Sequence, residues 1–149
     1  MPLTENCIIT INGAMDTEPV PSPDASDCIQ LMTRGNFVHR GSHFYITYKE
    51  TETTGYKDCT TVVKISDDGS QVTMSRFGPM ASQLVIEKGV RHVCYYETEF
   101  GAFNLGVVAD SISHTLGEEG GAADFSYTLD TESRLLSRNR VQLSVRMAN

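Results

Sequence analysis

Residues 61–76 read TVVKISDDGSQVTMSR. Apolar and polar side chains alternate on both sides of Asp68-Gly69, a pattern typical of two β-strands that each have one dry and one wet face and are joined by a two-residue turn. A hairpin centred on this turn pairs residues whose numbers add to a constant, so the turn predicts the register. The predicted pairs are Ile65 with Val72, Val63 with Met74, and Thr61 with Arg76.

The same alternation recurs along the chain, without the periodicity of a helix. It is interrupted from Met15 to Asp27 by Pro19, Pro21 and Pro23, and we expect a surface loop there because proline cannot donate to a sheet ladder. The other connections are short enough for hairpins, which favours one all-β domain, residues 1–149, built as an antiparallel up-and-down β-barrel of about eight to ten strands rather than as a sandwich. The predicted strands are 7–11, 28–39, 43–50, 59–66, 70–77, 82–88, 90–97, 101–114, 121–130 and 138–148.

Two further turns predict which side chains face the interior. A turn centred on Arg40-Gly41 pairs Phe37 with Phe44, Gly35 with Ile46, and Thr33 with Tyr48, whereas a turn about Glu99-Phe100 pairs Tyr96 with Phe103, Cys94 with Leu105, and His92 with Val107. In the sixth strand, Gly78-Pro79 leaves open whether Leu84 and Ile86 or Val85 face inward. The predicted interior also contains Ile29, Leu31, Phe125, Tyr127, Leu129, Val141, Leu143, Val145 and Met147.

Composition disfavours several functions. A formal charge of -7 and an isoelectric point near 5.0 oppose general nucleic-acid binding, which depends on Lys and Arg against phosphates. The start of the chain shows no secretory signal, and no apolar run approaches the roughly 20 residues of a membrane-spanning helix. We therefore expect a cytoplasmic protein that binds neither nucleic acid nor membrane. The arginines near the C-terminus, which we interpret as parts of solvated strand faces, are Arg134, Arg138, Arg140 and Arg146.

No metal site or other cofactor is predicted. His39 and His43 fall on opposite faces of their hairpin, so the two rings cannot share a metal ion. The cysteines form no C-x-x-C pair, and we expect reduced thiols that act as small apolar residues. These cysteines are Cys7, Cys28, Cys59 and Cys94.

Catalytic motifs are also lacking. The glycine-rich segment 117–121 has two glutamates and no following Lys-Ser/Thr, so it is a turn rather than a phosphate-binding loop. Ser111, Ser113 and His114 follow Asp110 within one predicted strand, where successive side chains point to opposite faces and cannot form a triad. An enzyme is therefore not predicted, although an activity is not excluded.

Arg76 is the most informative polar residue, because it shares a face with Val72 and Met74. A guanidinium on an apolar face requires a carboxylate, carbonyl oxygens or water to compensate it. In one interpretation it lies at the barrel rim, pairs with Glu50 or Glu97 and locks that end. In the other, it receives the acidic head of an apolar ligand bidentately, and three tyrosine hydroxyls contribute from the interior. These tyrosines are Tyr48, Tyr96 and Tyr127.

Five segments together carry a family resemblance: 35–41, 45–50, 72–78, 96–103 and 139–145. In order and spacing they resemble a small bacterial family of YwiB-like proteins, a domain of unknown function, over about residues 4–147. The resemblance implies a calycin-like antiparallel barrel, similar in architecture to lipocalins and fatty-acid-binding proteins, and no established activity. Glu99 stands where the family often has Pro.

Two functional hypotheses remain open at this point. The leading one is a barrel that binds a small apolar or amphipathic ligand, with Arg76 near its polar end. The alternative is a solid structural or protein-interaction barrel that acts through its outer surface, as either a monomer or a homodimer. Its motivation is the apolar character predicted for three outward-facing residues, Val62, Val93 and Val108.

Overall fold

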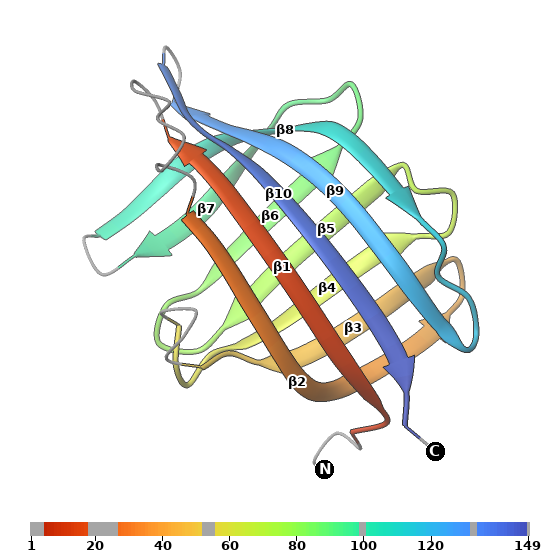
Figure 1. Ribbon diagram of the computed structural model, residues 1–149. Helices are drawn as coiled ribbons and strands as arrows, with labels where there is room; N and C mark the ends of the chain where they lie inside the picture. The colour runs from red at the N-terminus through yellow and green to blue at the C-terminus, as the bar shows by residue number, and fades with distance from the viewer. Residues whose placement is uncertain (1–4, 18–26, 52–55, 99–100, 132–133, 149) are drawn as a thin grey trace.

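A computed structural model describes residues 5–17, 27–51, 56–98, 101–131 and 134–148. Its strands form a closed antiparallel barrel in which each strand pairs with its neighbours in the sequence, and the first pairs with the last (Figure 1). The predicted up-and-down β-barrel is confirmed, and the described residues contain no helix. The strands are β1 (Cys7–Thr17), β2 (Asp27–Arg40), β3 (His43–Lys49), β4 (Thr60–Ser66), β5 (Gln71–Phe77), β6 (Ser82–Glu87), β7 (His92–Thr98), β8 (Gly101–His114), β9 (Gly120–Thr131) and β10 (Arg134–Met147).

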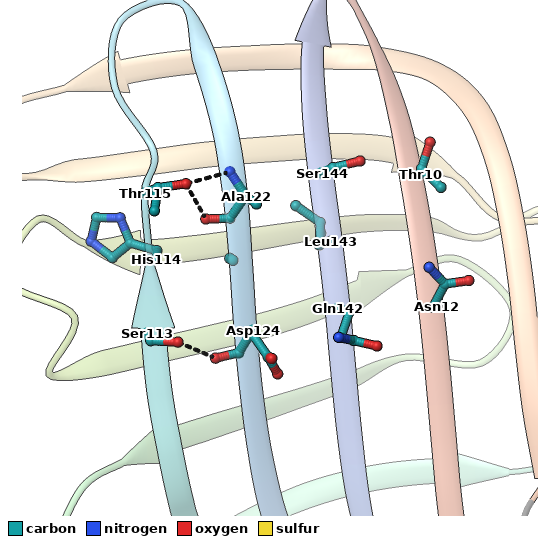
Figure 2. A pocket seen from close by; sticks show the side chains of 11 residues that line it. Thr10, Asn12, Ser113, His114, Thr115, Ala122, Asp124, Gln142, Leu143 and Ser144 are labelled. Carbon is teal, nitrogen blue, oxygen red and sulfur yellow. Dashed lines mark hydrogen bonds between the residues drawn. The ribbon is translucent and has the colours of Figure 1, made fainter.

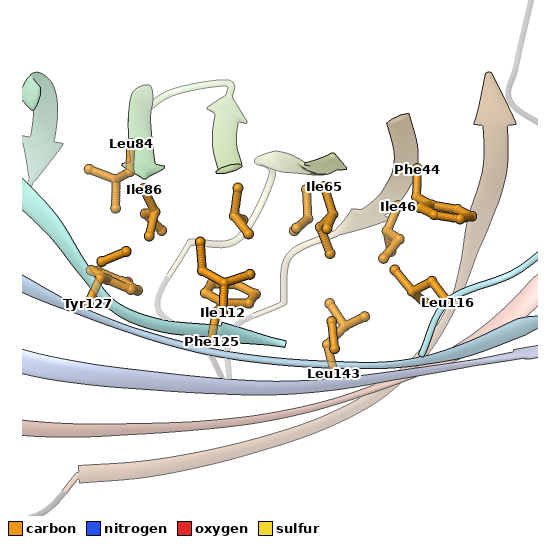
Figure 3. Close-up of a cluster of buried hydrophobic side chains, with 14 of the residues drawn as sticks. Phe44, Ile46, Ile65, Leu84, Ile86, Ile112, Leu116, Phe125, Tyr127 and Leu143 are labelled. Atoms are coloured by element: carbon orange, nitrogen blue, oxygen red, sulfur yellow. The ribbon is translucent and has the colours of Figure 1, made fainter. Parts of the chain in front are cut away.

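Apolar side chains fill a large part of the barrel interior. Figure 3 shows Phe44, Ile46 and Ile65 on one wall, facing Phe125 and Leu143 on the other. The sixth strand turns Leu84 and Ile86 inward, which resolves the ambiguity left by the sequence. Most of the predicted interior is confirmed; the buried members include Leu31, Phe37, Cys94, Leu105, Val107, Tyr127, Leu129 and Val145.

The register is as predicted for two hairpins and shifted in the third. The β4–β5 pairs and the β7–β8 pairs are those given by their turns. Between β2 and β3 the prediction is wrong by two residues: Phe37 pairs with Ile46 and Gly35 with Tyr48. The chain turns one residue later than predicted, through Gly41 at a φ of 61°, a left-handed conformation that glycine adopts without strain. A shift of two leaves every side chain on its predicted face.

Two strands are longer than predicted. The first strand does not end at Ile11 but runs to Thr17, and β10 begins at Arg134. Both are longer because they pair with each other as far as Thr17 and Ser137. The local pattern of Asn12 and Gly13 indicates a turn, but a strand with a neighbour on each side tolerates both residues. The predicted loop is therefore shorter than Met15–Asp27, and its three prolines lie outside the described residues.

Phe103 is a clear error of the sequence prediction, which placed it inside. Its side chain is 49% exposed although it pairs with Tyr96 in the predicted register. The first pair between β8 and β9 is Gly106 with Asp130, so Phe103 lies on a part of β8 that has only β7 beside it. Among the described residues β9 does not pair with this part of β8, which leaves the ring of Phe103 half exposed.

At the end of the barrel opposite to Arg76, His39 connects turns through hydrogen bonds. Its Nε2 lies 2.9 Å from Oδ1 of Asp67 and its Nδ1 2.5 Å from Oε1 of Glu118, while the ring stacks on Phe44. Asp67 and Glu118 belong to the β4–β5 and β8–β9 turns, and His114 adds a bond from Nε2 to the Asp67 carbonyl oxygen at 2.9 Å. One imidazole thus joins three hairpins that are remote in sequence.

We predict that His39 makes the stability of the protein depend on pH. The Glu118 and Asp67 carboxylates raise the pKa of His39, because they stabilise its charged form. The stabilisation is fully present below the ordinary histidine pKa of about 6.5 and is lost as pH rises through the higher folded-state pKa. Urea unfolding across this range should show that His39→Gln costs stability at acid pH and progressively less at alkaline pH. A pH-independent difference from the parent protein would contradict this role, and His43→Gln is the matched control.

Candidate functional site

Five side chains with polar groups in the interior lie on one register row that crosses five strands. The paired residues are Tyr48, Thr61, Arg76, Ser82 and Tyr96, each opposite the next in adjacent strands from β3 to β7. All five positions fall at the strand ends on the same side of the barrel, opposite to the end that His39 fastens. Because the strands are antiparallel and in register, residues that are far apart in sequence meet in one ring.

Arg76 is 8% exposed, and main-chain oxygens compensate its guanidinium. Its Nε donates to the Met80 carbonyl at 2.7 Å and its Nη2 donates to the Glu97 carbonyl at 3.0 Å. Within the described residues no carboxylate lies within 4.0 Å of it, so the predicted ion pair with Glu50 or Glu97 is absent there. The carboxylate of Glu97 instead accepts a bond from the Tyr95 hydroxyl. The Nε–Nη2 edge thus binds main chain, whereas bidentate binding of an acidic ligand through the Nη1–Nη2 edge stays a prediction.

Two tyrosine rings enclose the same guanidinium. Its central carbon lies 3.5 Å from the ring centre of Tyr56 and 5.1 Å from that of Tyr96, within the range of cation–π attraction. The two hydroxyls are 2.9 Å apart and hydrogen-bonded. Burial and this bond raise the pKa of Tyr56 to about 12, so its phenol remains neutral beside the arginine.

A cavity of about 210 Å³ opens beside this cluster, inside the barrel. All four predicted site residues, Arg76, Tyr48, Tyr96 and Tyr127, line it, so the structure brings them together. Burial raises the pKa values of Tyr48 and Tyr127, which keeps their phenols neutral as possible hydrogen-bond donors. The apolar part of the wall comes from Ile11, Leu31, Met74 and Leu84.

Two polar atoms in the cavity wall are without hydrogen bonds. Oε1 of Glu50 and Oγ1 of Thr61 are fully enclosed and have no partner among the described residues. Burial raises the pKa of Glu50, and the nearby Thr61 hydroxyl and Arg76 guanidinium offset this only in part. An enclosed polar atom without a partner costs about 1–3 kcal/mol, so this wall is not optimised for stability alone.

Part of this site is not evident from the sequence. Tyr56 lies between β3 and β4, outside both strands, and shares no strand pattern with Arg76. Glu50 is predicted only as an ion-pair partner. Thr61 was predicted opposite Arg76, and that position could have marked it as a member of the polar row.

A second hollow, of about 340 Å³, lies on the outer face of β8, β9, β10 and β1 (Figure 2). Several of its polar groups bind the sheet: Thr115 Oγ1 accepts from the Ala122 N–H at 3.1 Å, and Ser113 donates to the Asp124 carbonyl oxygen. The Asp124 carboxylate binds Arg140 at 2.7 Å. This hollow lacks the buried, unpartnered groups of the internal cavity, which is therefore the stronger candidate site.

Metal binding finds no support in the described part of the chain, where no three His, Cys, Asp or Glu side chains are grouped to hold an ion. His39 and His43 lie on opposite faces of the hairpin, as predicted: the first stacks on Phe44 and the second lies against Tyr45. The same ranges contain no helix with the length and apolar character needed to cross a bilayer.

These features define a class of protein, a closed ten-stranded antiparallel barrel with a polar hollow at one end. The model of a domain of unknown function, DUF1934, matches residues 14–143, and the chain belongs to this family. The crystal structure of the ywiB protein from Bacillus subtilis is similar, with a TM-score of 0.73 at 18% identity over 97% of this chain and 93% of that chain. The predicted family resemblance is confirmed, and at this identity the structural match shows the fold alone. Among curated proteins, no match is found.

We predict that Arg76→Ala destabilises the fold by about 3 kcal/mol, because it removes two charge-assisted hydrogen bonds and leaves two carbonyls and two aromatic faces without their partner. The free energy of unfolding in urea measures this. Arg138→Ala, at an exposed position of β10, should change it by less than about 0.5 kcal/mol. Equal effects of the two substitutions would show that Arg76 does not hold this end together.

Proposed function

We propose that this barrel binds a small amphipathic molecule in the cavity beside Arg76. The apolar part of the ligand packs against Leu31, Met74 and Leu84, and its polar end meets Arg76 together with Tyr48, Tyr96 and Tyr127. The observation that carries the proposal is a hollow of about 210 Å³ on which a guanidinium and four tyrosines converge. Apolar walls with a few convergent polar groups are the usual composition of ligand sites.

The volume limits the ligand. A cavity of about 210 Å³ has the volume of roughly seven liquid water molecules at about 30 Å³ each. The rest of the interior is filled by side chains such as Phe125, Ile65 and Val63, all fully buried. The site therefore suits a molecule with one ring or a short chain, and a long fatty acid is too large for it.

The proposed setting is the cytoplasm of a bacterium. Cys7, Cys59 and Cys94 are buried free thiols, which supports a reducing compartment. Like lipocalins, the protein would hold its ligand inside the barrel rather than on its outer face.

Native mass spectrometry of gently purified protein tests the proposal. We expect an excess mass of at most about two hundred daltons that disappears on denaturation, consistent with the cavity volume. Leu84→Phe places a larger side chain in the cavity and should remove the excess mass, because the ligand and the added ring compete for one space. Gln83→Phe adds the same ring on the exposed outer face and should retain the ligand. Bare mass in the parent protein, together with no binding of small aromatic probes, would refute the proposal.

A second candidate function uses the outer surface. Val93 and Tyr95 on β7 are 66% and 50% exposed, and Phe77 on β5 is 58% exposed. Val62 and Val108, which were predicted to contribute, are only half-buried strand residues. Exposed apolar side chains at neighbouring positions favour contact with another protein or with a second copy of the chain.

Light scattering tests self-association through this face. If β7 forms a homodimer interface, the mass should double with rising concentration, and Val93→Lys should shift dimerisation to at least about tenfold higher concentration because it buries an unpaired charge. Lys88→Ala, at an exposed turn position, is the control. A monomer at all concentrations would exclude self-association.

A further inference from the structure

The internal cavity contains a cation, Arg76, that forms no ion pair within 4.0 Å with a carboxylate of the described residues. Arg76 is held by two carbonyl oxygens and two aromatic rings, which solvate its charge but do not cancel it. Only two of the five guanidinium N–H groups make these main-chain bonds, so further donors are available on the same group. A positive centre in a half-open, partly apolar cavity attracts an anion more strongly than it would in water.

Glu50 lines the same cavity, yet it does not form an ion pair with Arg76. Its Oε1 atom is enclosed without a hydrogen-bond partner among the residues described, and the adjacent Thr61 hydroxyl is in the same condition. A full negative charge on such a carboxyl would be poorly solvated, whereas a neutral carboxyl has lower desolvation cost and provides an O–H donor. The geometry thus favours Glu50 as a donor rather than as the counter-ion of Arg76.

We propose that the ligand is a small carboxylic acid, bound as its anion between the guanidinium of Arg76 and the protonated carboxyl of Glu50. This inference rests on the proposed ligand-binding function and specifies its chemistry. Arg76 supplies the charge, while Glu50 shares its proton with the ligand carboxylate. Where Glu50 is ionised in the free protein, binding of the ligand anion is coupled to the uptake of one proton from the buffer by Glu50.

Other ligand chemistries fit less well. An amine would place a second cation beside Arg76 in a cavity of about 210 Å³. A neutral polar ligand would leave the arginine charge without a counter-ion. The neutral phenols of Tyr48 and Tyr127 add donors to the wall, which suits a carboxylate that can accept several hydrogen bonds.

Three matched probes test the ligand class: benzoate, benzamide and benzylamine, which have similar shape and differ in charge. Titrations of the full chain by calorimetry or NMR should show benzoate binding at least about tenfold more tightly than benzamide, and no binding of benzylamine. Equal affinity for benzoate and benzamide, or a preference for benzylamine, would overturn the carboxylate inference and leave a ligand-binding barrel in place. Binding of none of the three, together with a bare native mass, would refute the proposed function itself.

Proton uptake on ligand binding tests the role of Glu50. Benzoate affinity should fall as the pH rises from acid to alkaline values, and the binding enthalpy should depend on the ionisation enthalpy of the buffer, because protons are taken up. Glu50→Gln keeps a donor but cannot titrate, so it should bind benzoate within about threefold of the parent value at acid pH and lose both effects. An affinity independent of pH and of buffer in the parent protein would overturn the role of Glu50, and this readout requires no variant to fold. Glu118→Gln, at the opposite end of the barrel, controls for the removal of one carboxylate.

Discussion

The register of four successive hairpins, from β3 to β7, is the constraint on which the polar end of the barrel depends. It places Tyr48, Thr61, Arg76, Ser82 and Tyr96 in one ring, although these residues come from strands spread over much of the sequence. A slip by one residue in any of these hairpins would turn part of the ring toward solvent and leave Arg76 among apolar neighbours without its carbonyl partners. Closure of the barrel by β1 and β10 prevents such a slip, because every strand is then held on both sides.

Arg76 shows how a protein can bury a cation without an ion pair. A buried guanidinium is costly unless its N–H groups are satisfied, and here carbonyl oxygens of Met80 and Glu97 accept two of them. The rings of Tyr56 and Tyr96 lie within cation–π distance and leave the group positively charged. The same contacts that stabilise this end of the barrel therefore keep a cation beside the cavity.

The sequence predicts this fold wherever a turn determines the register. Asp68-Gly69 lies at the centre of the four-residue connection 67–70, and a hairpin centred there gives the observed β4–β5 pairs and the inward position of Arg76. Around Gly41, however, turns of different length preserve the same alternation, and the predicted β2–β3 pairs are off by two. Phe103 has the alternation of an interior residue, but burial requires a neighbouring strand that a local pattern does not reveal. Tyr56 reaches Arg76 from a connection without periodicity, so only the tertiary structure could identify it.

The two ends of the barrel differ in how completely their polar groups are hydrogen-bonded. At one end, His39 joins three turns, and Phe44 packs beneath the ring. Toward the other end, the apolar packing gives way to a cavity in which Glu50 and Thr61 retain polar atoms without partners. Larger apolar side chains at Leu31 or Met74 would fill this space and add stability. The wall instead keeps a cation, several phenols and a carboxyl around a hollow, which is an unfavourable arrangement for an empty protein and a favourable one for a protein that binds an acid.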